Sequence, residues 1–163
     1  MKIEISLNDK SINQAIKELE KYKRDLDNKA RIVVERLASL GATNASLGFA
    51  RAVTSENDVQ VTVEWVNSNT MRIRATGEEV LFIEFGTGIT YGYGHPMAQE
   101  LGYGPGTYPT KLAKGKWDNP NGWWYSKDGN PKHTYGNPPN AVMYDTMKMI
   151  EREAERVVKE VFG

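Results

Sequence analysis

The residues best equipped for chemistry are two histidines, His95 and His133, and the carboxylates nearest to them in the sequence: Glu100, Asp118 and Asp128. Imidazole and carboxylate groups can share a metal ion or pass a proton, so a metal site or an acid–base pair is the first hypothesis. Their spacing matches neither a helical pair of zinc-binding histidines nor an acidic calcium loop. We therefore expect local hydrogen bonds for both histidines, no carboxylate partner, no metal and no cofactor.

Glu84 is a lone carboxylate at the end of an apolar run, and a buried carboxylate of this kind can serve as a general base. The sequence around it contains no nucleophile elbow and no Ser-His-Asp order. The string Gly86-Thr87-Gly88 lacks the lysine and the helix start of a phosphate loop. We expect Glu84 to pair with a backbone amide or with an arginine of another subunit, and the chain not to be an enzyme.

Aromatic side chains gather late in the chain, at Trp117, Trp123, Trp124 and Tyr125, among several lysines. Such a group can form a stacking platform for sugars or single-stranded nucleic acid. Exposed Trp and Tyr are also enriched at protein–protein interfaces, which we favour here. A carbohydrate- or cell-wall-binding module, or a tail-associated muralytic enzyme, is the alternative.

Composition narrows the function classes. The 163 residues fit one domain, and 21 basic residues balance 21 acidic ones, which disfavours a protein drawn onto nucleic acid by its net charge. The chain has no cysteine, so disulfides and thiol chemistry are excluded. Residues 1–7 alternate apolar and polar side chains, unlike a signal peptide or a membrane-spanning helix, so no membrane partner is expected.

The hydrophobic pattern predicts the elements that position these residues. Residues 1–7 are expected to form a strand, and a long amphipathic helix starts at Asn8 or Asp9, with a kink or break near Gly41 to Asn44. Alternation then predicts a hairpin from Val59 to Thr76, followed by a third strand, Val80-Leu81-Phe82-Ile83, that is covered on both faces.

A long loop follows over residues 86–136, and it holds 11 of the 15 glycines and three of the four tryptophans. Because Gly and Pro break regular structure, we expect this arm to form neither helix nor strand by itself. A second amphipathic helix starts at Pro138-Pro139. The predicted fold class is α+β, with two helices packed on a small antiparallel sheet and a long Gly/Pro/aromatic insertion.

Three parts of the chain together resemble the tail-completion family of long-tailed bacteriophages, the minor tail components that join head to tail. They are the long helix, the string Val80-Leu81-Phe82-Ile83-Glu84-Phe85-Gly86-Thr87-Gly88, and the string Gly136-Asn137-Pro138-Pro139-Asn140-Ala141-Val142-Met143-Tyr144 that opens the last helix. The resemblance covers nearly the whole chain, and the insertion looks like the longer variant of phages and prophages of Gram-positive bacteria.

The resemblance implies one tail-completion-like domain over residues 1–163, with the inserted arm at 86–136. It implies a non-enzymatic virion protein that forms a hexameric ring at the neck, after assembly in the host cytoplasm. The implied partners are further copies, the tail-tube or tail-terminator protein and the head–tail connector, with contact to DNA in the channel left open. The expected assembly contacts are Glu84, Phe85, Trp117, Trp123, Trp124 and Tyr125.

Overall fold

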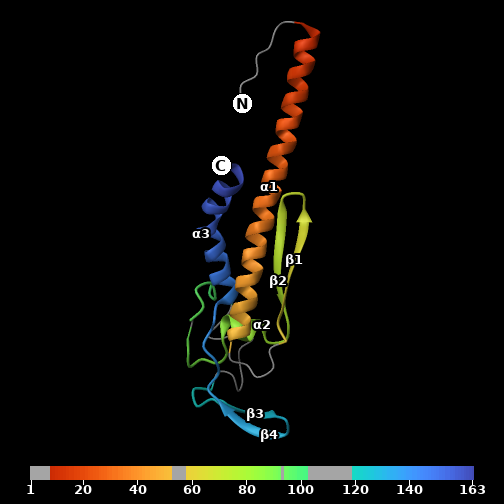
Figure 1. The fold of residues 1–163 in the computed structure, drawn as a ribbon. Coiled ribbons are helices and arrows are strands. Elements are labelled where there is room, and N and C mark those ends of the chain that lie inside the picture. The colour runs from red at the N-terminus through yellow and green to blue at the C-terminus, as the bar shows by residue number, and fades with distance from the viewer. Residues whose placement is uncertain (1–7, 53–57, 93, 103–118) are drawn as a thin grey trace.

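The computed structural model of the chain describes residues 8–52, 58–92, 94–102 and 119–163 (Figure 1). Its elements in chain order are α1 (Asp9–Arg51), β1 (Gln60–Asn67), β2 (Thr70–Thr76), α2 (Val80–Phe85), β3 (Trp123–Lys127), β4 (Asn130–Thr134) and α3 (Val142–Phe162). The α+β class predicted from the sequence is confirmed. The predicted strand at 1–7 lies outside the described residues.

Helix α1 is the longest element, and it runs without interruption from Asp9 to Arg51. It begins where expected, because the Asn8 side chain accepts a hydrogen bond from the Ser11 amide at 2.9 Å. Of the kink or break predicted near Gly41 to Asn44, the break is absent, because the helix is continuous there. A Cβ atom at Gly41 would come within 2.6 Å of side-chain carbons of both Ile73 and Ile150, so this glycine gives neighbouring elements room to approach.

The hairpin of β1 and β2 confirms the prediction from alternation. The two strands are antiparallel, with Val63 opposite Ile73 and Trp65 opposite Met71. These apolar side chains share the face toward α1, where the Arg31 guanidinium lies 4.7 Å from the centre of the Trp65 ring. Figure 1 shows the hairpin alongside the C-terminal half of α1.

The expected third strand is wrong, because residues 80–85 form the short helix α2. The Ile83 amide donates to the Glu79 carbonyl at 2.9 Å, which is a helical bond. Each of the two described sheets therefore has only two strands. A short run that is apolar on both faces suits a buried helix as well as a buried strand, and periodicity cannot separate them.

Helix α3 packs antiparallel along α1. The Asn44 side-chain amide donates to the Thr146 hydroxyl at 2.9 Å. Closer to the C-terminus of α3, the Arg36 guanidinium lies 3.6 Å from the Glu160 carboxylate. The helix starts at Val142 and not at the two prolines, because Ala141 adopts a left-handed backbone with φ 48°. The buried cluster between the helices and α2 contains Ala45, Phe49, Ala52, Ile83 and Val142.

The arm, residues 86–136, was predicted to form neither helix nor strand, and part of it does form strands. Residues 123–134 form an antiparallel hairpin, β3 and β4, at the end of the molecule away from the start of α1 (Figure 1). Asp128 and Gly129 both have positive φ at its turn, the geometry that an Asp-Gly turn favours. Trp117 lies outside the described residues. Within the described part of the chain, no helix is long and apolar enough to cross a membrane.

Candidate functional site

The borders of the arm meet at a buried junction centred on Glu84. Its carboxylate accepts hydrogen bonds from the Met143 amide at 2.8 Å and from the Tyr144 amide at 3.0 Å. These amides belong to the first turn of α3, where Ala141 offers no side-chain cap. Glu84 therefore caps α3 from another element, and its negative charge suits the positive end of the helix dipole.

His95 is the third partner of this carboxylate, with Nε2 lying 3.0 Å from Glu84 Oε1. His95 Nδ1 accepts the Met97 amide proton at 3.1 Å, so Nε2 carries the ring hydrogen and donates it to Glu84. The ring is buried, with its centre 4.3 Å from that of Phe85. The expectation that His95 has no carboxylate partner is wrong.

The Glu84–His95 pair has the residue types of a catalytic dyad. Both carboxylate oxygens and both ring nitrogens are bonded to protein groups, and both side chains are buried. The pair ties loop residues after α2 to the start of α3. Of the two partners predicted for Glu84, a backbone amide or an arginine of another subunit, the structure shows backbone amides, and they belong to the same chain.

A second link closes the base of the arm. Thr87 and Asn137 form an isolated antiparallel bridge, in which the Thr87 amide donates to the Asn137 carbonyl at 2.9 Å. The Thr87 hydroxyl also accepts the Asn137 amide proton at 2.9 Å. Gly136 has φ 95°, and a Cβ there would overlap the Thr87 carbonyl. The two strings that border the arm are therefore parts of one structure.

The aromatic residues of the arm separate into buried and exposed members. Trp123 is buried within the chain, and its ring lies so close to Gly88 that a Cβ there would come within 2.9 Å. Trp124 on the opposite face of β3 is 65% exposed, whereas Tyr125 is 39% exposed. Of the six expected assembly residues, Glu84, Phe85 and Trp123 are thus buried inside one subunit, and Trp124 and Tyr125 are available to a neighbour.

Three exposed rings form a row on the outer face of β3 and β4. The His133 ring centre lies 5.1 Å from that of Trp124 and 4.9 Å from that of Tyr135. The interplanar angles are 63° and 82°, so the rings meet edge to face. His133 is held by the Asn121 carbonyl at 2.9 Å, which confirms the local hydrogen bond expected for it.

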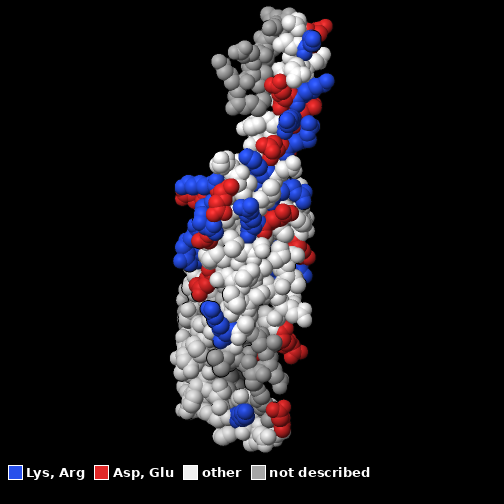
Figure 2. Space-filling model, in the orientation of Figure 1, with Lys and Arg blue, Asp and Glu red and all other residues white. Residues whose placement is uncertain are grey.

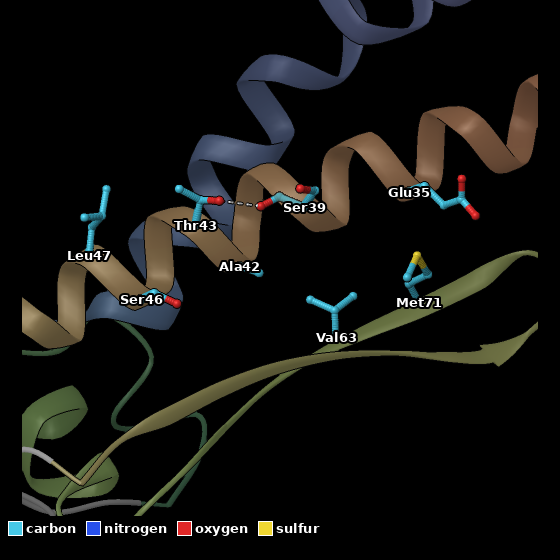
Figure 3. A pocket seen from close by; sticks show the side chains of 8 residues that line it. All are labelled: Glu35, Ser39, Ala42, Thr43, Ser46, Leu47, Val63 and Met71. Carbon is cyan, nitrogen blue, oxygen red and sulfur yellow. Dashed lines mark hydrogen bonds between the residues drawn. The ribbon is translucent and has the colours of Figure 1, made fainter.

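A groove of about 490 Å³ opens between α1 and the β1–β2 hairpin (Figure 3). Its walls are mostly small or apolar, with Leu47 on α1 and with Val63 and Met71 on the hairpin. The Thr43 hydroxyl donates to the Ser39 carbonyl of its own helix at 2.9 Å, and Glu35 is the one carboxylate in the lining. The lining suits an apolar side chain better than a reacting substrate. Among the described residues, no three His, Cys, Asp or Glu side chains gather as metal ligands.

Neither family models, nor curated proteins, nor solved structures gave a match to this chain. No sequence signal located His95 at the junction, because a loop without periodicity joins it to Glu84. Thr87 and Asn137 were easier to predict as parts of the site, since they belong to the two strings singled out in the sequence.

Proposed function

We propose that this chain is a structural subunit of a long-tailed bacteriophage particle, and that it forms a hexameric ring at the head-proximal end of the tail and joins tail to head. The observation that carries the proposal is the junction between residues 84–88 and 136–144. These are the two strings that resemble the tail-completion family, and they lie together through the Glu84–Met143 and Thr87–Asn137 hydrogen bonds.

Exposed apolar side chains at both ends of the molecule support an assembly role. Trp124 lies on β3 and Tyr135 directly follows β4, whereas Ile16 and Leu19 lie near the start of α1. Figure 1 shows this hairpin and the start of α1 at opposite ends of the molecule. Such exposed groups are typical of interaction surfaces. A subunit between two partners, here the tail-tube or tail-terminator protein and the head–tail connector, would cover both ends.

The proposal assigns no catalytic step to the chain. The buried acid–histidine pair serves to hold α3 and the loop in place, because its polar atoms are engaged with protein groups. Non-specific contact with channel DNA would be weak, since such binding depends on positive charge and the chain has no net charge.

Labelling of particles tests the proposal. A tag for gold labelling at the end of α3 should place the chain in purified particles, with the label between head and tail. A label at the distal tail tip, or particles that lack the chain altogether, would contradict it.

Carbohydrate binding is the second candidate, and the 65% exposure of Trp124 favours it. The Trp124, His133 and Tyr135 rings meet at interplanar angles of 63° and 82°, so together they form no flat platform for stacking. We therefore rank it second. Co-sedimentation of the chain with purified peptidoglycan, lost in Trp124→Ala, would reverse this ranking.

A further inference from the structure

The first part of α1 has an apolar stripe that α3 does not cover. Helix α3 ends at Phe162, whose ring lies 5.6 Å from the Lys29 ammonium. N-terminal to this point, Leu19 is 53% exposed. The other exposed members of the stripe are Ile12, Ile16 and Leu26. We call residues 9–28 the α1 overhang.

The stripe continues a helix-packing face that is already in use. Steps of three and four residues lead from Leu26 to Gly41, Asn44 and Gly48. At these positions α1 meets α3, through the Asn44–Thr146 hydrogen bond and through close approach of Ile150 to Gly41 and of Val142 to Gly48. The overhang thus presents the same face that accepts a helix further along α1.

Charge favours a second copy as the occupant. The overhang contains five basic and five acidic residues, and Figure 2 shows both signs interspersed along this end of the molecule. An anionic membrane or nucleic acid would select a basic polar face. A segment with no net charge does not repel its own copy.

The flanks of the stripe set the direction of pairing. Glu20 and Asp27 lie on one flank of the overhang, and Tyr22 lies on the other. In an antiparallel pair the acidic flanks would face one another, whereas in a parallel pair each acidic flank faces the flank of Tyr22. Lys23 interrupts the stripe, and a single lysine at such a position fixes register at a cost in stability.

We propose that the α1 overhangs of neighbouring copies pack in pairs as parallel, in-register two-stranded coiled coils, with Ile12, Leu19 and Leu26 facing the partner helix. The inference rests on the proposed function, in which copies lie side by side in a ring. It names the surface through which they associate.

Cysteine cross-linking tests the direction, because the chain has no native cysteine. Ile12→Cys and Leu26→Cys would each be oxidised, alone and mixed, in the purified full-length chain and in particles. In-register parallel packing predicts that each variant cross-links to itself, whereas Lys21→Cys on the opposite face does not. Cross-links in the mixture alone would show antiparallel pairing and overturn the inference. Equal yields for all three positions, or no cross-link in either sample, would also overturn it.

Two further variants measure how much the apolar stripe contributes to self-association. Sedimentation should show self-association weakened by about tenfold or more in Leu19→Glu and strengthened by a similar factor in Lys23→Leu, since one buried leucine accounts for at least this much. Circular dichroism checks that each variant is folded. Unchanged association in both would overturn the inference. The proposed function would survive that result if labelled particles still carried the chain at the neck.

Discussion

The Glu84 carboxylate accepts a hydrogen bond from the Met143 amide at 2.8 Å, and this contact joins α2 to the first turn of α3 across the base of the arm. The same carboxylate holds Tyr144 and His95, so one side chain orders three segments. Loss of Glu84 would leave several buried donors without an acceptor.

Glu84→Ala should therefore lower the free energy of unfolding by about 3 kcal/mol or more, since each unpaired buried donor costs roughly 1–3 kcal/mol. Urea denaturation followed by circular dichroism measures the loss. Glu64→Ala is the matched control, because Glu64 pairs with Arg72 and Arg74 at the exposed face of the hairpin. This control should cost about 1 kcal/mol or less, and equal losses would show that Glu84 is not central to the junction.

Gly136 is expected to tolerate no side chain. It has φ 95°, and a Cβ would overlap the Thr87 carbonyl. Gly136→Ala should cost about 2–3 kcal/mol, more than the 1 kcal/mol or so that a positive φ alone imposes. Gly129→Ala is the control, since Gly129 has φ 79° with open space around it. Similar melting temperatures for the two variants would argue against a tight junction.

The stability of the chain should depend as strongly on the size of the residue at position 41. Gly41→Leu would push Ile73 and Ile150 apart and should destabilise the chain by about 3 kcal/mol, as overpacking of a filled core does. Ala50→Leu, at an exposed position on the same helix, should change stability by about 0.5 kcal/mol or less. Thermal melts of the two variants compare them directly, and a stable Gly41→Leu protein would refute the close approach.

The two adjacent tryptophans should have opposite effects. Trp123→Ala removes a buried ring that packs on Gly88, so limited proteolysis should cut the arm faster than in the parent chain. Trp124→Ala removes an exposed ring, so it should leave proteolysis unchanged and reduce incorporation into particles. Normal assembly of Trp124→Ala would remove the β3–β4 face from the proposed interfaces.

Periodicity was enough to predict α1, the β1–β2 hairpin and α3, because each has a long apolar pattern of period 3.6 or 2. The apolar run at 80–83 was too short to distinguish a strand from the helix α2. The Asp128-Gly129 pair does indicate a hairpin turn between β3 and β4. The many Gly and Pro residues of the arm led us to predict a loop there instead.

The site was predictable only in part. A buried carboxylate needs donors, so the residue type of Glu84 was enough to predict a donor, either a backbone amide or an arginine of another subunit. Which amides it binds depends on how α2 meets α3, and the approach of His95 depends on the path of a loop without regular structure. Burial of Trp123 beside an exposed Trp124 follows from the alternation of a strand that was not predicted.

Cryo-electron microscopy of the neck in purified particles tests the central claim most directly. The account predicts a closed ring of this chain between head and tail, with the α1 overhangs and the β3–β4 hairpins contacting neighbours at its two ends. A neck map in which every ring is built from other proteins would contradict it.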